Sequence, residues 1–194
     1  MSKLFSPMRL TSKYTLNNRL AVAPMTTTQS NPDGTVSQKE TAWLERLAKD
    51  GYGIVISCAA SISIDSVAFE NQLSAGSDEM LEGLTGLANG LKKHDSINLI
   101  QLCHAGSRAI KAQPRSASSY LLPQIPDFVP PLELSTDQIA GIVNDFASAC
   151  ERVAKAGFSG IEFHGANGYL FTQFFSKMTN LRQDEYGGSV ANRA

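Results

Sequence analysis

The sequence predicts an α/β protein with a parallel sheet, because short apolar segments alternate with amphipathic helical segments four times along 194 residues. Strands are expected at 20–23, 54–56, 98–100 and 160–163. Both a doubly wound sheet and a barrel fit this alternation. No G-x-G-x-x-G follows the first strand and no G-x-x-x-x-G-K-[ST] occurs, which disfavours the doubly wound alternative.

The first unit joins a strand at 20–23 to a helix. Its strand is a short apolar run closed by Pro24-Met25, and we expect it to be buried on both faces. Ser37 and Glu40 have the spacing of a capping box, and apolar residues follow at helical spacing until Gly51. One of them, Trp43, is expected in the core.

The later units repeat this pattern with different connections. Leucines and an alanine at helical spacing predict a helix over 81–91, before the strand at 98–100. An irregular excursion over the surface is expected at 106–134, where the prolines are Pro114, Pro123, Pro126, Pro130 and Pro131. A second capping box, Ser135 to Gln138, precedes a helix that ends near Gly157. Its apolar stripe is Ile139, Ile142, Val143, Phe146, Cys150 and Val153.

Composition argues against several classes of function. The net charge is -1, from 17 basic and 18 acidic residues without a run of one sign, so nucleic acid is not an expected partner. No secretory leader and no apolar stretch approaching roughly 20 residues is present, and we expect a cytoplasmic protein without a membrane partner. Three widely spaced cysteines predict reduced thiols and no metal site.

The residues at the carboxyl ends of the predicted strands are the candidates for chemistry, since active sites of α/β proteins lie there. Small, amide and imidazole groups gather at these ends. They lie in Pro24-Met25-Thr26, Ser57-Cys58-Ala59, Gln101-Leu102-Cys103-His104 and His164-Gly165-Ala166-Asn167-Gly168-Tyr169.

The last of these segments indicates a carbonyl-activating site. A neutral His164 and the Asn167 amide can donate hydrogen bonds to one substrate oxygen, and the Tyr169 hydroxyl can supply a proton. A plainer interpretation is that His164 and Asn167 satisfy backbone groups at the start of a helix, and local spacing does not separate the two.

With its flanks, this segment resembles the signature of the Old Yellow Enzyme family of FMN-dependent ene-reductases. The resemblance is carried by GIEFHGANGYLFTQFFSKMTNLRQDEYGGSVANR at 160–193, by LFSP at 4–7, by NRLAVAPM at 18–25 and by QLCHAG at 101–106. It covers essentially the whole chain.

The resemblance implies FMN as cofactor and NADH or NADPH as reductant. It places Pro24, Met25 and Thr26 along the isoalloxazine, the Ala59 backbone near the flavin edge and the Gln101 amide on its pyrimidine side, with His164 also at the cofactor.

The same resemblance implies the chemistry. His164 and Asn167 would hold the oxygen of an α,β-unsaturated carbonyl or nitro compound, and Tyr169 would protonate Cα after flavin N5 delivers hydride to Cβ.

The fold that the resemblance implies is a (β/α)8 TIM barrel, of which about the first four β/α units are present. Residues 1–194 would be a single domain, the N-terminal half of the FMN-binding barrel, because such barrels have about 250 residues or more. A homo-oligomer or a complementing C-terminal half is therefore expected. The alternative is a non-catalytic half-barrel that associates with itself or a partner chain without holding flavin.

Some residues depart from the family pattern or have a structural interpretation. Thr26 stands where one branch of the family has a redox-tuning Cys. Thr28 stands where that branch has an aromatic substrate contact. His104 is expected to support the loop near Gln101. A loop-stabilising role is expected for Arg182, Asp184 and Arg193.

Overall fold

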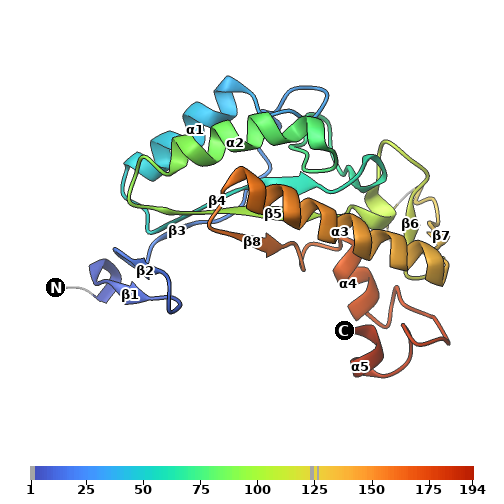
Figure 1. Cartoon of the computed structure of the whole chain (residues 1–194). Helices are drawn as coiled ribbons and strands as arrows, with labels where there is room; N and C mark the ends of the chain where they lie inside the picture. Colours follow the sequence, from blue (N-terminus) through green and yellow to red (C-terminus); the bar gives the residue numbers. More distant parts are fainter. Residues whose placement is uncertain (1–2, 123–124, 126) are drawn as a thin grey trace.

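Four strands form a parallel sheet whose spatial order, β3-β4-β5-β8, follows the sequence (Figure 1). The computed structural model describes residues 3–122, 125 and 127–194. The strands are β3 (Ala21–Val22), β4 (Ile54–Ser61), β5 (Ile97–Cys103) and β8 (Gly160–Phe163). Sequential order with parallel neighbours is the arrangement of a barrel wall, whereas a doubly wound sheet reverses its order.

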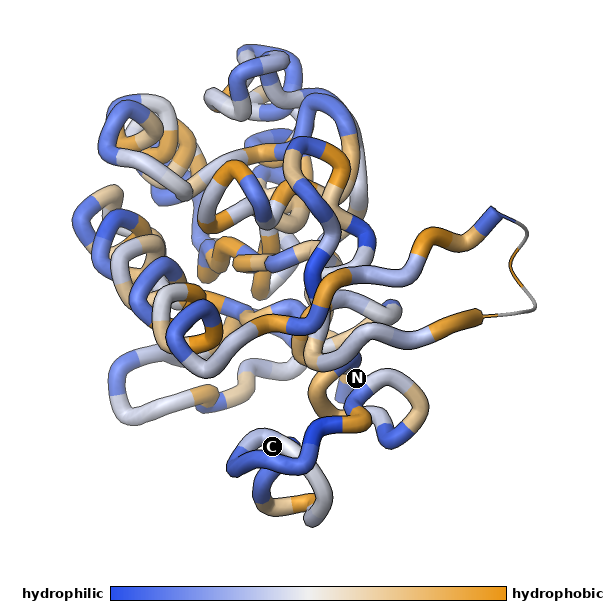
Figure 2. The backbone as a smooth tube through the Cα atoms, turned by 90° about the vertical axis from the view of Figure 1, so that its right-hand side faces the viewer, coloured by the Kyte–Doolittle hydropathy of each residue, from blue (hydrophilic) through white to orange (hydrophobic). Residues whose placement is uncertain are grey.

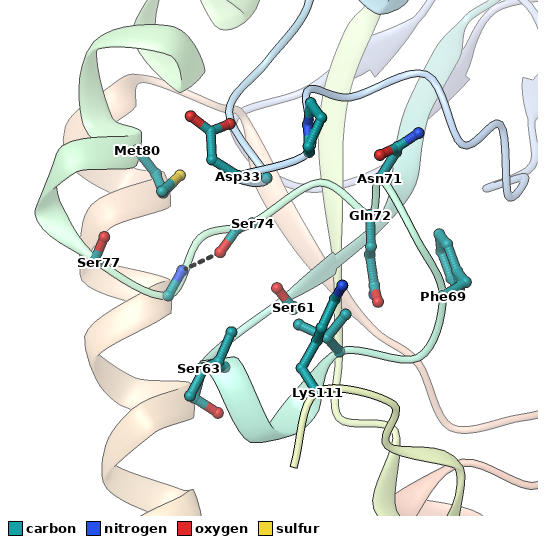
Figure 3. Close-up of a pocket in the computed structure, with 15 residues that line it drawn as sticks. Asp33, Ser61, Ser63, Phe69, Asn71, Gln72, Ser74, Ser77, Met80 and Lys111 are labelled. Carbon is teal, nitrogen blue, oxygen red and sulfur yellow. Dashed lines mark hydrogen bonds between the residues drawn. The ribbon is translucent and has the colours of Figure 1, made fainter.

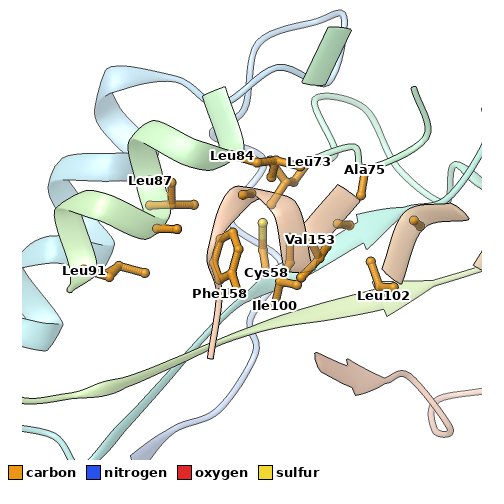
Figure 4. Packing of buried hydrophobic residues seen from close by; sticks show 14 of the residues in the cluster. Cys58, Leu73, Ala75, Leu84, Leu87, Leu91, Ile100, Leu102, Val153 and Phe158 are labelled. Carbon is orange, nitrogen blue, oxygen red and sulfur yellow. The ribbon is translucent and has the colours of Figure 1, made fainter. Parts of the chain in front are cut away.

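Three long helices pack on one face of this sheet: α1 (Gln38–Lys49), α2 (Leu81–Leu91) and α3 (Thr136–Ala156). They share one buried apolar cluster with β4 and β5, which Figure 4 shows from close by. Leu87 of α2, Val153 of α3 and Ile100 of β5 all contribute to it. Helices on one face and sequential strands together give a partial (β/α) barrel, as the sequence predicts.

Shorter elements complete the described chain. They are η1 (Lys3–Phe5), β1 (Met8–Arg9), β2 (Thr15–Leu16), η2 (Ile64–Ser66), η3 (Asp78–Met80), η4 (Gly106–Arg108), β6 (Arg115–Ser116), β7 (Leu132–Glu133), α4 (Leu170–Phe175) and α5 (Val190–Arg193).

The two predicted capping boxes differ in the structure. At α3 the box is complete, since Ser135 and Gln138 each accept a hydrogen bond from the other's backbone N–H, and Gly157 ends the helix with φ +93°. At α1 only Ser37 caps the helix, accepting from the Glu40 backbone N–H. The Glu40 side chain is buried instead, so this part of the prediction is wrong.

Two predictions of burial are also wrong. The first strand was expected to be buried on both faces, but Ala21 is exposed and Val22 only half-buried, because one edge of β3 has no partner strand among the described residues. Val143, expected on the apolar stripe of α3, is 61% exposed. Trp43 is half-buried against the main apolar cluster.

β4 and β5 extend beyond the predicted strands. β4 continues to Ser61, and a register shift lies between Ile56 and Ala59, where β4 has one more residue than β5. Gln101 lies inside β5 and not after it. The described residues of the irregular segment expected at 106–134 form η4, β6 and β7 as their only regular structure. Pro123 and Pro126 lie outside the described residues.

Figure 2 shows the described flanks of that segment extending away from the body of the molecule. In the part of the chain that the structure describes, no helix combines the length and apolar character needed to cross a membrane.

Candidate active site

One cavity of about 180 Å³ lies at the carboxyl ends of the parallel strands. All eight site residues predicted from the sequence line it, together with Phe69, which the sequence did not indicate. The lining is Pro24, Met25, Thr26, Ala59, Phe69, Gln101, His164, Asn167 and Tyr169. Phe69 belongs to the segment after β4, where no strand end or motif marks it.

His164 follows β8, and its backbone N–H donates to the Leu102 carbonyl oxygen over 2.9 Å. Its Nδ1 accepts from the Ala166 backbone N–H at 3.3 Å, so the neutral ring carries its proton on Nε2. Burial lowers the pKa of His164, against an opposing effect of the Glu162 charge. The ring is therefore neutral near pH 7 and can donate through Nε2.

Asn167 does not cap the following helix. The N-cap residue of α4 is Tyr169, and no side chain caps it. Asn167 has φ +56° and Gly168 has φ +75°, so the chain turns through two left-handed residues immediately before Tyr169. The Asn167 side chain makes no hydrogen bond within the described residues, and its amide is available to a ligand.

Tyr169 lies between His164 and Arg108. Its ring meets the imidazole edge-on with centroids 4.7 Å apart, and the Arg108 guanidinium carbon lies 5.6 Å from the phenol centroid. Burial raises the pKa of Tyr169, the Cys103 thiol adds to the rise, and Arg108 opposes it. The phenol is therefore protonated near pH 7. Arg108 was not predicted from the sequence.

Gln173 holds the segment that carries Tyr169. It is 2% exposed, and its Nε2 donates to the Gly168 carbonyl oxygen over 2.8 Å and to Ser107 Oγ over 2.9 Å. Its Oε1 accepts from the Ser107 backbone N–H and from Ser116 Oγ. One buried amide thus joins α4, β6 and the loop that carries Arg108.

Gln101 is 6% exposed at the cavity. Its Nε2 donates to Glu162 Oε1 over 2.6 Å, so a carboxylate on the neighbouring strand orients this amide. Glu162 is a further residue that sequence reasoning missed. The alternation of side chains along β8 could have indicated it, since Glu162 and His164 are two residues apart.

The loop after β3, which carries Met25 and Thr26, is held in place by a buried carboxylate of α1. Glu40, 1% exposed, accepts from Ser30 Oγ over 2.6 Å and from Cys58 Sγ over 2.7 Å. Cys58 retains its proton, because burial and, to a lesser degree, the Glu40 charge raise its pKa. This network joins α1, β4 and the loop after β3.

His104 supports the loop next to the cavity, as expected. It is 4% exposed, its Nδ1 accepts from the Gly106 backbone N–H over 3.0 Å, and its carbonyl oxygen accepts from the Leu170 N–H. Arg182 also has the expected structural role. Its guanidinium donates to the Leu134 carbonyl oxygen over 2.6 Å and to the Asp184 carboxylate.

Arg193 likewise stabilises the structure of its own region, because its guanidinium donates to the Phe175 and Gly188 carbonyl oxygens.

The family model for the NADH:flavin oxidoreductase / NADH oxidase family matches residues 3–194. The chain belongs to this family. That membership confirms the resemblance drawn from the sequence, and it implies FMN as the family's cofactor and NADH or NADPH as its reductant.

Individual members of the NADH:flavin oxidoreductase family align along the whole chain. A probable NADH-dependent flavin oxidoreductase of Bacillus subtilis, YqiG, is 37% identical over 201 residues, which cover 98% of this chain and 51% of the relative. An NADPH dehydrogenase of Listeria monocytogenes is 38% identical, over 100% of this chain and 57% of its own. The chain therefore spans about half the length of the curated relatives it matches.

Solved structures give the same picture of the fold. An Old Yellow Enzyme homologue from Zymomonas mobilis superposes with a TM-score of 0.90 at 28% identity, over 99% of this chain and 56% of that one. Morphinone reductase in complex with tetrahydroNAD gives a TM-score of 0.89 at 29% identity, over 100% and 57%. The fold is thus about half of an Old Yellow Enzyme-type barrel.

The residues around the cavity fit one part of a flavin. Pro24, Met25 and Phe69 offer apolar surface to a flat ring, while Gln101 and Thr26 offer polar groups to its edge. The cavity is smaller than the roughly 300–1,000 Å³ usual for small-molecule sites. Its lining holds no lysine or arginine, so these residues fit the ring and not the phosphate.

Proposed function

We propose that the chain contributes the ring-binding and substrate-activating half of an FMN-dependent NAD(P)H oxidoreductase that reduces activated C=C bonds. The substrates would be α,β-unsaturated carbonyl or nitro compounds. The observation that carries this proposal is that His164, Asn167 and Tyr169 line the same cavity as Pro24, Met25 and Gln101.

His164 and Asn167 would bind the oxygen of the electron-poor substrate. Both groups can donate, one through Nε2–H of a neutral imidazole and the other through an amide without an internal partner. Addition of hydride to Cβ builds negative charge on that oxygen, so two fixed donors stabilise the transition state more than the ground state. Each such donor contributes about 3 kcal/mol.

Tyr169 would supply the proton that completes the reduction at Cα. Bound FMN would supply the hydride, which it takes from NADH or NADPH. Because burial keeps the Tyr169 phenol protonated near neutral pH, its hydroxyl can act as a general acid toward the carbanionic carbon. Gln173 and Arg108 would keep the ring in place during this step.

We further propose that residues 1–194 form a single domain, the N-terminal half of the barrel, which pairs with a C-terminal half or with another copy. The described part of the sheet leaves an edge of β3 and an edge of β8 unpaired, and Phe163 on β8 is 51% exposed. A cytoplasmic location belongs to the same proposal, and the unpaired thiols of Cys58, Cys103 and Cys150 fit a reducing compartment.

The test is a visible absorption spectrum of the purified chain, with and without added FMN, after gel filtration. Flavin absorbance that co-elutes with the chain, and that NADH or NADPH bleaches without oxygen, is the expected result. The same measurement on a version extended by a second barrel half would show whether that half is needed. A colourless protein in both forms would overturn the proposal and favour the non-catalytic half-barrel.

A further inference from the structure

Glu162 is a carboxylate on the inner face of the half-barrel. Its neighbours in β8 point the other way, since Ile161 packs against the main apolar cluster and the Phe163 ring lies edge-on to an aromatic ring of α3, with centroids 5.6 Å apart. Because side chains alternate along a strand, Glu162 lies on the same side as His164, which lines the active-site cavity. Within the described residues, no lysine, arginine or histidine forms an ion pair with it. The hydrogen bond that it accepts from Gln101 is therefore not shared with a cation.

Strand register brings Glu162 opposite Gln101. The two residues are Cα partners in the parallel pair of β5 and β8, and Gln101 Nε2 donates to Glu162 Oε1 over 2.6 Å. The pairing continues beyond them, where the His164 N–H donates to the Leu102 carbonyl oxygen over 2.9 Å. Both side chains thus stand on paired strands and not on loops, which fixes their positions.

Gln101 differs from the other deeply buried glutamines of the described chain. Gln72, which Figure 3 shows at a separate cavity of about 420 Å³, uses both ends of its amide: Nε2 donates to the Ala59 carbonyl oxygen and Oε1 accepts from the Ala68 N–H. Both ends of Gln173 are bonded as well. Gln101 is 6% exposed, yet its Oε1 makes no hydrogen bond within the described residues. A buried amide oxygen that lines a cavity without a partner points to a ligand.

Glu162 determines which end of the Gln101 amide meets the cavity. An ionised carboxylate only accepts hydrogen bonds, so the amide must turn its Nε2 toward Glu162. Oε1 and the second N–H of the amide are then left for the cavity. With a neutral amide at position 162, which both donates and accepts, either orientation of Gln101 would be satisfied.

An acceptor at this point selects one edge of a flat ring. The oxidised isoalloxazine has a single N–H, at N3, which lies between two carbonyl groups as in a cyclic imide, whereas N1, N5 and both oxygens only accept. Gln101 Oε1 can therefore be paired by N3–H alone, and the second N–H of the amide by a carbonyl beside it. A ring without an imide N–H would leave this buried oxygen unpaired, which weakens binding.

We propose that Glu162 is a positioning residue, which holds the Gln101 amide with Oε1 toward the cavity so that the cavity selects a ring with an imide N–H. This inference rests on the proposed function and deepens it, because it names the edge of the ring that is recognised and the carboxylate on which that recognition depends. Glu162 acts through Gln101 and needs no contact with the ring.

The test compares the binding of two probes to the purified chain by flavin fluorescence. Lumiflavin is the ring without the phosphate chain, and 3-methyllumiflavin carries no proton on N3. The unaltered chain should bind lumiflavin more tightly, and Glu162→Gln should reduce that preference about five-fold, the contribution of one hydrogen bond. Crowding by the methyl group is the same in both proteins, so the change in preference measures the hydrogen bond. Thermal unfolding shows that the variant is folded.

Two further variants separate positioning from a general effect of charge. Glu151→Gln removes the same charge from an exposed position of α3 and should leave the preference unchanged. Gln101→Met removes the amide. In that background Glu162→Gln should have no further effect on lumiflavin binding, because Glu162 acts through Gln101. A direct effect of the Glu162 charge on the ring would persist there.

Three results would overturn the inference: no binding of lumiflavin, equal binding of the two probes by the unaltered chain, or a preference that Glu162→Gln leaves unchanged. An effect of Glu162→Gln that persists without Gln101 would overturn it as well. If lumiflavin binds and NADH or NADPH reduces it, these last three results leave the proposed oxidoreductase standing. A Glu162-dependent preference in a chain whose bound flavin neither NADH nor NADPH reduces would support the inference and refute the proposed oxidoreductase.

Discussion

The His164 imidazole meets the Tyr169 phenol edge-on, with ring centroids 4.7 Å apart and ring planes at 74°. The proposed hydrogen-bond donor to the substrate oxygen and the proposed proton donor to its carbon therefore lie side by side. Both groups are in the required protonation state near neutral pH, because burial lowers the pKa of the imidazole and raises that of the phenol. The proposed chemistry depends on this pair.

Tyr169→Phe should slow alkene reduction by about 100-fold, because alkene reduction needs the phenolic proton. Flavin reduction by NAD(P)H does not need this proton and should be nearly unchanged. Stopped-flow measurement of the two half-reactions, in a form that holds FMN, checks this. The ring and its contact with His164 remain in the variant. An equal loss in both half-reactions would refute the role of Tyr169 as proton donor.

Asn167→Gly should lower the rate of alkene reduction about 100-fold while leaving the free energy of unfolding within about 0.5 kcal/mol. The amide has no partner within the described residues, and glycine tolerates the φ of +56° without strain. Reaction rates test the predicted loss of activity, and urea unfolding curves test the predicted stability separately. A large loss of stability with an unchanged rate would show that Asn167 has only a structural role.

Gly106→Ala should destabilise the chain by about 1–3 kcal/mol, measured by urea unfolding. Gly106 has φ +60°, and a Cβ there would lie 2.2 Å from Gln173 Oε1, the buried amide that holds Gly168.

The matched control for Gly106→Ala is Gly86→Ala. A Cβ at Gly86, inside α2, would meet nothing within 4 Å, and alanine should stabilise that helix by about 0.5–1 kcal/mol. Effects of the same sign at both positions would contradict the role given to Gln173.

Acid should destabilise the chain through His104. Burial lowers the pKa of His104 from 6.5 to about 4, and the Asp65 charge opposes this only in part. The unfolded chain therefore takes up the proton at higher pH than the folded chain, and stability falls as pH drops from about 6.5 toward 4. The loss from this group is at most about 3 kcal/mol.

Urea unfolding at pH 7 and pH 4.5 measures this effect, with His104→Asn as the comparison because its amide oxygen can accept from the Gly106 N–H in place of Nδ1. We expect a smaller pH-dependent loss in the variant. An identical loss in both proteins would show that other groups determine the acid sensitivity.

The sequence predicted the parts of the fold and of the candidate site that depend on local pattern. The complete box at Ser135 and the left-handed Gly157 lie where periodicity and capping placed them. The eight predicted residues meet in one cavity, because parallel strands bring their carboxyl ends to the same edge. The roles of these residues stay predictions that the experiments above test.

The features that the sequence did not predict depend on contacts between distant segments. Glu40 has the spacing of a capping residue, but its carboxylate is buried and accepts hydrogen bonds from Ser30 and Cys58 instead. Gln173 bonds Ser107 over a separation of 66 positions, and Arg108 packs on the Tyr169 ring, and no local pattern reveals such contacts. Exposure of Ala21 reflects the missing neighbour of an edge strand, a property of the sheet and not of the apolar run itself.

The extra residue in β4 between Ile56 and Ala59 determines which β4 side chains face the helices and which face the candidate active-site cavity. Before it, odd-numbered Val55 faces the helices, and after it even-numbered Cys58 and Ala60 do so. Ala59 thereby faces the candidate active-site cavity, and the Cys58 thiol faces Glu40. Deleting one residue here would exchange the two faces of β4 beyond the deletion. The Cys58 thiol would then face the cavity, and the buried Glu40 carboxylate would lose its hydrogen bond from Cys58. Natural variation in chain length should therefore avoid this stretch and fall in the loops on either side of it.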